Sequence, residues 1–167
     1  MGSDTAHLPW RESLTLENIH VVGGASLSPI DVTDKWTLIE SLKNALVTRE
    51  KLDAVLVAEI EKELMEREKL MSTGIGEQMA IPHAVVPHSN RFMTECAIVK
   101  GGIDFDSIDG TKAFVVVMLV APKSALQEHL RVMASIAQVF YNAATRHRVI
   151  AATTPAEVLE IIRAAPV

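Results

Sequence analysis

Apolar residues recur at helical spacing in the first half of the chain, which predicts two consecutive helices. The first covers residues 34–47, where Asp34 is placed to cap its N-terminus. Its predicted buried side consists of Trp36, Ile39, Leu42 and Leu46. The second helix covers residues 53–70. Arg67 continues, by one turn, the apolar stripe formed by Val57, Ile60 and Leu64.

Three short segments rich in β-branched residues predict strands. Residues 19–22 form one that stops at two glycines, and residues 96–105 form another that runs into a turn. Residues 113–120 are apolar throughout, as expected for a central strand covered on both faces, and Pro122 ends this strand.

Two further helices are predicted in the second half of the chain, each opening with a capping box. The first covers residues 124–140 and the second residues 154–164. The capping pairs are Ser124 with Gln127 and Thr154 with Glu157. The buried face expected for the longer helix consists of Leu126, Leu130, Met133, Ala137 and Phe140.

Strands that alternate with helices indicate an α/β fold of α+β-like character. We expect a single layered domain in which a central mixed β-sheet is flanked by helices on both faces. The domain is assigned to residues 14–165. Residues 1–13 form a turn-rich N-terminal extension, part of which can stem from cloning.

The composition indicates a globular protein, since 49% of the 167 residues are apolar and 22% are charged. A net charge of −5 gives no basic footprint, which argues against nucleic acid as a partner. The single cysteine, Cys96, excludes an intrachain disulfide and favours the reducing cytoplasm. No apolar run reaches the length of a membrane span.

Candidate chemistry centres on His83, one of six histidines. It lies in residues 72–84, where two glycines and a proline predict a loop. Pro82 fixes the backbone before the ring, and Gly74 and Gly76 let the backbone approach a bound anion closely. A histidine taken at random is more often structural or exposed, so these features alone leave its role open.

The residues around His83 follow a specific pattern. An acidic residue comes first, and six residues separate it from an aliphatic residue and a glycine. Two further residues precede the run aliphatic-Ala-aliphatic-Pro-His, which ends with a small residue. The residues concerned are Glu68, Ile75, Gly76, Met79, Ala80, Ile81, Pro82, His83 and Ala84. This pattern resembles the active-site signature of the fructose/mannitol-type enzyme IIA domains of the bacterial phosphoenolpyruvate-dependent sugar phosphotransferase system, a family with nitrogen-regulatory relatives. The resemblance extends from about Leu14 to Arg163.

The resemblance implies that His83 is phosphorylated by the carrier HPr and passes the phosphoryl group to an enzyme IIB, without a metal or cofactor. His129, in "EHLRVM", matches a second histidine of the family site, and Arg67, in "REKL", matches an arginine that lines it. A relay of this kind implies a cytoplasmic protein that meets the membrane only through a transporter. The pattern assigns neither a sugar nor an oligomeric state.

The residue types suit this chemistry. A neutral imidazole is a competent nucleophile near pH 7 when its other ring nitrogen is held as a donor, so we predict a backbone carbonyl or a hydroxyl beside His83. Arg67 offers a planar charged fork for phosphoryl oxygens. His129 falls in the first turns of its predicted helix, where the helix dipole favours an anion. No phosphate-binding loop for direct use of ATP is present.

Other polar residues near His83 have plainer interpretations. Glu77 and Gln78 are expected to be solvated loop residues. His88 follows His83 by five positions, but a zinc site is not indicated, because Pro87 breaks the segment and neither cysteine nor carboxylate stands at ligand spacing. We therefore predict no metal site and place His88 in a loop near the rim.

Three functions fit the pattern. The leading one is a phosphoryl carrier of sugar transport, the second a nitrogen-type regulator that binds target proteins according to its phosphorylation state, and the third a degenerate relative without a relay. Apolar residues 84–86 follow His83 where relatives often carry glycine and a basic residue. An apolar docking patch is therefore an alternative to a basic one.

Overall fold

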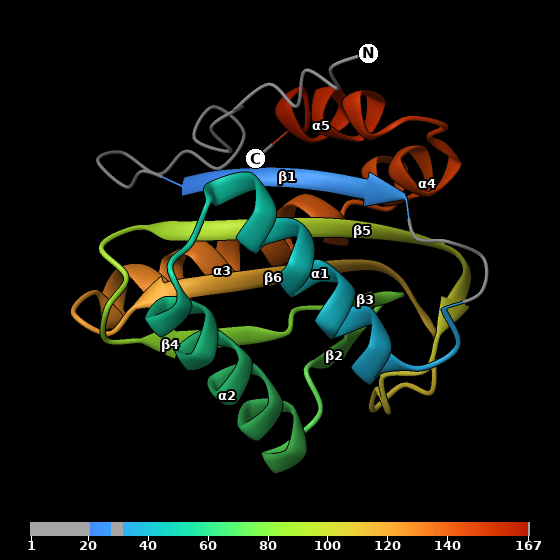
Figure 1. The fold of residues 1–167 in the computed structure, drawn as a ribbon. Helices are drawn as coiled ribbons and strands as arrows, with labels where there is room; N and C mark the ends of the chain where they lie inside the picture. Colours follow the sequence, from blue (N-terminus) through green and yellow to red (C-terminus); the bar gives the residue numbers. More distant parts are fainter. Residues whose placement is uncertain (1–20, 28–31, 167) are drawn as a thin grey trace.

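The structure, a computed structural model, describes residues 21–27 and 32–166, so the N-terminal extension assigned to residues 1–13 lies outside it. Along the described chain, a first strand is followed by two helices, then by a group of strands, and finally by three helices (Figure 1). In order they are β1 (Val21–Leu27), α1 (Lys35–Glu50), α2 (Ala54–Leu70), β2 (Gly74–Gly76), β3 (Met79–Ala80), β4 (His83–Val86), β5 (Phe92–Ile103), β6 (Ala113–Pro122), α3 (Leu126–Tyr141), α4 (Ala143–Ala151) and α5 (Pro155–Arg163).

The strands form one mixed sheet in the order β1-β5-β6-β3-β2, with β4 also paired to β6. β1 runs parallel to β5, whereas β5 and β6 are antiparallel. β3 and β4 both run parallel to β6. The predicted central mixed sheet is therefore confirmed.

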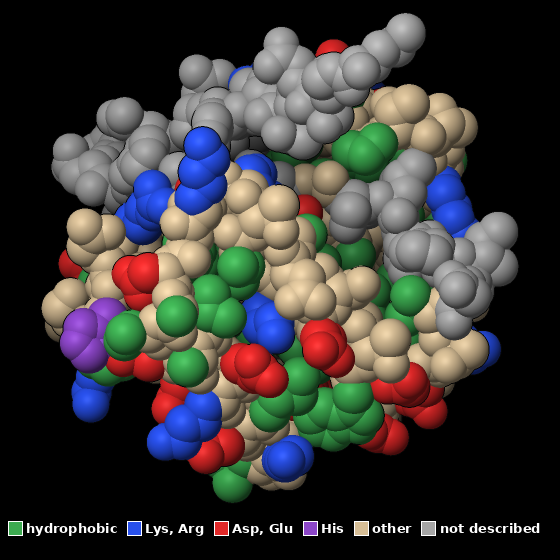
Figure 2. Space-filling view, viewed as in Figure 1, with side chains coloured by type: hydrophobic (Ala, Val, Ile, Leu, Met, Phe, Trp, Pro, Cys, Tyr) green, Lys and Arg blue, Asp and Glu red, His purple; other side chains and the backbone are tan. Residues whose placement is uncertain are grey.

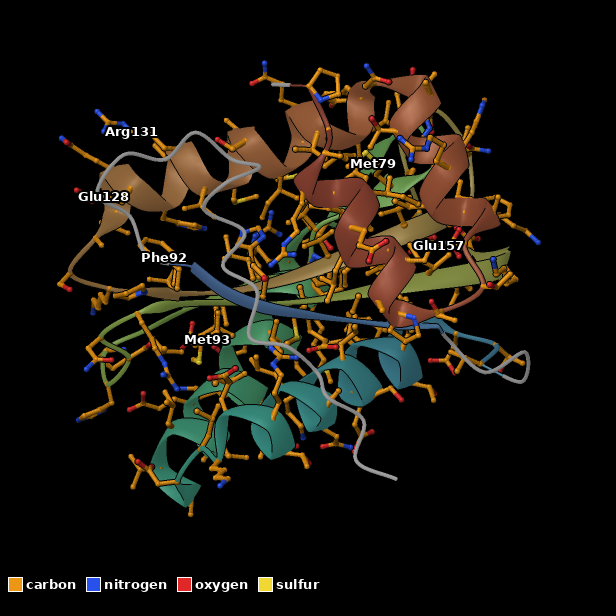
Figure 3. The ribbon with its side chains drawn as sticks, turned by 90° about the horizontal axis from the view of Figure 1, so that it is seen from above. Met79, Phe92, Met93, Glu128, Arg131 and Glu157 are labelled. Atoms are coloured by element: carbon orange, nitrogen blue, oxygen red, sulfur yellow. The ribbon has the colours of Figure 1, made fainter. Side chains whose placement is uncertain are left out.

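Helices cover both faces of this sheet, as predicted. Seen from above, α1 and α2 form one layer and α3, α4 and α5 form the other (Figure 3). Neighbouring residues of β5 serve opposite layers: Phe92 packs in the core beneath α3 to α5, and Met93 in the core beneath α1 and α2. The alternation of side chains along a strand explains this division.

The strand predictions succeed where a run is buried on both faces. β6 covers the predicted segment, and its residues 115–121 are buried. The end predicted for the first strand is wrong, because β1 continues through Gly23 and Gly24 to Leu27. Its parallel ladder with β5, from Val21 to Leu27, outweighs the weak strand preference of glycine.

The two N-terminal helices are confirmed, and so is the predicted cap of the first, Asp34. The Asp34 carboxylate accepts from Thr37 N at the start of α1, and the Asp53 carboxylate accepts from Leu56 N at the start of α2. The stripe on α2 ends differently from the prediction, because Glu68 rather than Arg67 is the buried residue of the last turn.

The predictions for α3 are wrong in two respects. Its N-cap position is Ala125 and no side chain caps it, so Ser124 and Gln127 form no capping box. Its buried residues are His129, Val132, Ile136, Val139 and Phe140, whereas Leu126 and Leu130 are 58% and 68% exposed. Apolar residues occur around most of this helix, so two faces fit the helical period and tertiary packing selects one.

The last two helices complete the layer behind the sheet. α5 begins at Pro155 with Thr154 as its N-cap, as predicted, and the Glu157 carboxylate accepts from Thr153 N. α4 was not predicted as a separate helix.

The opposite surface, formed by α1 and α2, carries Lys and Arg side chains interspersed with Asp and Glu (Figure 2). Within the described ranges, no helix combines the length and apolar character needed to cross a membrane.

Candidate functional site

His83 lies at a break in the strand that pairs with β6. β3 and β4 share one register against β6, since Met79 is opposite Val115 and His83 is opposite Leu119. Residues 81–82 interrupt the strand because Pro82 has no N–H to donate. His83 is therefore the first residue of β4, not part of a loop as predicted.

The side chain of His83 points to the α3 side of the sheet. In β4, Ala84 and Val86 pack in the core beneath α1 and α2, while Val85 packs against the opposite core. His83 shares the face of Val85 because strand residues alternate. This orientation directs the imidazole toward the N-terminal turn of α3.

The break also supplies a hydrogen-bond partner for the imidazole. The Nδ1 atom of His83 lies 2.9 Å from the carbonyl oxygen of Ile81. A carbonyl only accepts, so Nδ1 carries the proton and Nε2 is unprotonated and carries the lone pair. The predicted group that fixes the tautomer is thus a backbone carbonyl, that of Ile81.

Arg67 approaches His83 from the last turn of α2. Its Nε–H donates to His83 Nε2 over 3.2 Å, and one terminal nitrogen donates to the Met71 carbonyl over 2.6 Å. The guanidinium is thus held against the nitrogen that carries the lone pair. This contact agrees with the tautomer assigned from Ile81.

His129 completes the group. It lies in the first turn of α3, and its ring centre is 5.5 Å from that of His83 with the ring planes tilted by 57°. The side chain is buried, and its Nε2 has no hydrogen-bond partner among the described residues. A buried polar nitrogen without a partner is uncommon and favours a ligand at this place.

Electrostatics keep both imidazoles neutral near pH 7. Burial lowers the pKa of His83, and the charge of Arg67 lowers it further, while the hydrogen bond to Ile81 and the charge of Glu68 oppose the shift. Burial, followed by the charge of His83, lowers the pKa of His129. The neutral form is the nucleophilic form of histidine.

The remaining polar residues singled out in the sequence lie elsewhere. Glu77 and Gln78 form the tight turn between β2 and β3, both with positive φ. The Glu77 carboxylate is 59% exposed and lies 3.4 Å from the Arg146 guanidinium. The imidazole of His88 is exposed and pairs with Glu59 of α2.

Sequence reasoning missed the surroundings of Glu68, which it named only as the start of the signature. This side chain is fully buried one residue beyond Arg67, and it pairs with Lys35 of α1. Glu68 follows Ile60 and Leu64 at four-residue spacing, so a carboxylate on a buried stripe was the available signal.

Exposed apolar side chains lie close in sequence to two of the three site residues, Arg67 and His129. Leu70 and Met71 follow Arg67 at the end of α2, with exposures of 82% and 66%. Leu126 and Leu130 lie on the first turns of α3, beside His129. The residues next to them that point to solvent, Glu128 and Arg131, carry opposite charges (Figure 3).

Comparison with known proteins places this site in a family. The model of the family described as "Phosphoenolpyruvate-dependent sugar phosphotransferase system, EIIA 2" matches residues 26–165. The chain is 32% identical over 151 residues to a nitrogen regulatory protein of Pseudomonas aeruginosa, covering 89% of this chain and 95% of that protein. The chain therefore belongs to this EIIA family and is a component of a phosphotransferase system.

Solved structures agree. The nitrogen regulatory protein IIA-Ntr from Neisseria meningitidis superposes with a TM-score of 0.69 at 27% identity, over 85% of this chain and 92% of that one. The mannitol enzyme IIA of Escherichia coli, solved in complex with phosphorylated enzyme IIB, gives a TM-score of 0.65 at 21% identity, over 83% of this chain and 97% of that one. At that identity the second likeness concerns the fold alone.

Proposed function

We propose that this protein is a phosphoryl carrier in which Nε2 of His83 accepts a phosphoryl group from an HPr-type phosphocarrier and passes it to an enzyme IIB. The observation that carries the proposal is the arrangement of His83: Nδ1 is 2.9 Å from a carbonyl, and Nε2 faces Arg67. The lone pair thus lies on the unprotonated nitrogen that accepts from the permanent cation, Arg67. Such a carrier acts in the cytoplasm.

In the forward step the Nε2 lone pair forms a bond to phosphorus. The bond between phosphorus and the donor breaks, and its electron pair remains with the donor. Nδ1 keeps its proton and its bond to the Ile81 carbonyl, so no proton has to leave the attacking nitrogen. The positive charge that the ring gains on phosphorylation lies beside that carbonyl oxygen.

The transferred group spreads negative charge over its oxygens, so positioning and charge stabilisation dominate this reaction. Arg67 turns its Nε–H from the imidazole to a phosphoryl oxygen and provides a planar charged fork. The unpartnered nitrogen of His129 donates to another oxygen, in the field of the α3 N-terminus.

Partner docking is proposed to use the apolar side chains around the site: Leu70, Met71, Leu126 and Leu130. Their exposure and their position beside Arg67 and His129 support the apolar docking patch rather than a basic one. Buried cores of protein interfaces are depleted in charge, which such a patch suits.

The test uses the full chain with phosphoenolpyruvate, enzyme I and HPr. We expect acid-labile phosphate on the wild type and none on His83→Ala. His88→Ala is the matched control, because it removes an exposed histidine five residues away and should be labelled normally. Labelling of His83→Ala at the wild-type level would refute the assignment.

A regulatory role is the second candidate, favoured by the 32% identity to a nitrogen regulatory protein. Here phosphorylated and unphosphorylated His83 would present different surfaces to a target protein. Transfer of the phosphate to a sugar-specific enzyme IIB supports the carrier of transport. Failure of that transfer, together with binding of a regulatory protein to one phosphorylation state only, supports the regulator.

A further inference from the structure

The carboxylate of Glu68 is fully buried yet has several partners. Both of its oxygens lie 3.2 Å from Thr73 N, and one also accepts from the Thr73 hydroxyl. The other oxygen is 3.1 Å from Lys35 Nζ. A buried carboxylate with this many donors holds them in fixed positions, because leaving any one unpaired is costly.

A continuous path of hydrogen bonds connects this carboxylate with the imidazole of His83. Glu68 accepts from the peptide N–H of Thr73, and the Thr73 carbonyl accepts from Ile81 N over 3.0 Å. The Ile81 carbonyl in turn lies 2.9 Å from His83 Nδ1. Hydrogen bonds in such a chain polarise and orient one another.

The partners of the Ile81 peptide groups make this path available. The next residue, Pro82, still bonds to β6, because its carbonyl accepts from Leu119 N over 2.9 Å, whereas both peptide groups of Ile81 have partners outside β6. Its N–H goes to Thr73 and its C=O to His83, so the two ends of one residue join the buried carboxylate to the ring.

Lys35 balances the charge of Glu68. It is the first residue of α1, where a cation opposes the helix dipole, so its burial there calls for a specific partner. Its Nζ lies 2.8 Å from Asp106 as well as 3.1 Å from Glu68. Burial alone would lower the pKa of Lys35, but the bonds to Asp106 and Glu68 raise it, so the amine stays charged.

We propose that Glu68, held in place by Lys35, is a positioning residue that sets the tautomer of His83 through Thr73 and Ile81. This inference rests on the proposed function for its consequence, namely a lone pair on the nitrogen that faces Arg67. If the Ile81 carbonyl turns away, the proton is free to move to Nε2. That nitrogen is then no nucleophile, and it opposes the Arg67 donor.

A purely structural role for the pair would be to tie α1 to α2. The chain offers a matched control, because Lys43 and Glu61 also join these helices, over 3.3 Å. Lys43 is as buried as Lys35, with side-chain exposures of 8% and 11%. Replacing Lys43 therefore tests helix tethering without touching the path to His83.

The experiment measures the ring tautomer of His83 by two-bond proton–nitrogen correlation NMR on the full chain labelled with ¹⁵N-histidine. Wild type is expected to show the Nδ1–H form. In Glu68→Met, which has no acceptor for Thr73, the ratio of Nδ1–H to Nε2–H should fall about fivefold or more, the effect of losing one ordinary hydrogen bond.

Glu68→Gln keeps an acceptor oxygen and should stay within about twofold of wild type. Lys35→Met should lower the ratio in the same direction as Glu68→Met, and this variant also serves if Glu68→Met does not fold. Lys43→Met should leave the ratio unchanged. The proposal is overturned if the ratio of Nδ1–H to Nε2–H in Lys35→Met, and in Glu68→Met where it folds, equals that of Lys43→Met. It is also overturned if this ratio falls as far in Glu68→Gln as in Glu68→Met.

The consequence for reactivity is measured with phosphoramidate, a small phosphodonor that needs no protein partner. Glu68→Met should be phosphorylated about fivefold more slowly than wild type, with Lys43→Met unaffected. The two proposals fail separately: a tautomer shift in a protein that HPr never phosphorylates leaves the positioning role intact and refutes the carrier.

Discussion

Replacing Arg67 by methionine tests the geometry of the site directly. Methionine keeps an apolar stem of similar length but removes the Nε–H that lies 3.2 Å from His83 Nε2. It also removes the bond to the Met71 carbonyl. Two quantities should respond: the rate of phosphorylation and the pKa of His83.

The rate should fall by about 10²–10³, the usual loss when one preorganised donor to a developing negative charge is removed. The pKa of His83 should rise, because the charge of Arg67 now adds to burial in lowering it. Protonation removes the lone pair, so the decline in rate toward acid pH should begin at a higher pH in the variant than in wild type.

The rate is measured by rapid quench in a single turnover with phosphorylated HPr, and the pKa by NMR titration of the ring. Lys69→Met is the matched control, since it removes one positive charge from the same turn of α2 at an exposed position. A loss below about threefold, or a pKa of His83 that stays constant or falls, would refute the assigned role of Arg67.

Three further predictions address docking, backbone and pH. Leu130→Asp should raise the KM for HPr about tenfold, the effect of losing one interface anchor, and should leave labelling by phosphoramidate unchanged. Val55 is also exposed but lies at the far end of α2, so Val55→Asp should change neither the KM nor the labelling. Gly76→Ala should lower the free energy of unfolding by about 1–3 kcal/mol, because φ is +80° and a Cβ would lie 2.7 Å from an aspartate oxygen; Gly101→Ala has open space and should be near neutral in urea unfolding. Burial lowers the pKa of both site histidines, so the unfolded chain binds more protons below about pH 6.5 and the stability falls there. The urea concentration at the unfolding midpoint should therefore be lower at about pH 5.5 than at about pH 7.5. An equally large decrease in a variant with glutamine in place of both histidines would contradict this.

The sequence predicted the layers of this fold because burial leaves a direct trace in residue type. The run from Val115 to Ala121 is apolar on both faces of β6, and the predicted cap Asp34 stands directly before α1. The face of α3 was mispredicted because Leu130 and Val132 satisfy the helical period equally well. Only packing against the sheet distinguishes them.

The site was predictable in part. The signature and two matching residues indicated His83, Arg67 and His129, and the structure brings these three together. The role of Ile81 could not be predicted from its residue type, because Ile81 acts through its backbone carbonyl while its side chain packs in the core. Lys35 is distant from Glu68 in sequence, so their pairing depends on how α1 lies against α2.

The shared register of β3 and β4 imposes a constraint on chain length. Each residue advances a strand by about 3.3 Å and turns the next side chain to the opposite face. One residue inserted or deleted between Ala80 and His83 would therefore turn the imidazole toward the α1 layer, away from His129. A change of two residues would restore the face but displace the ring along β6 by about 6.6 Å. The number of residues from Met79 to His83 is therefore fixed, because neither an odd nor an even change of length keeps the His83 ring beside that of His129.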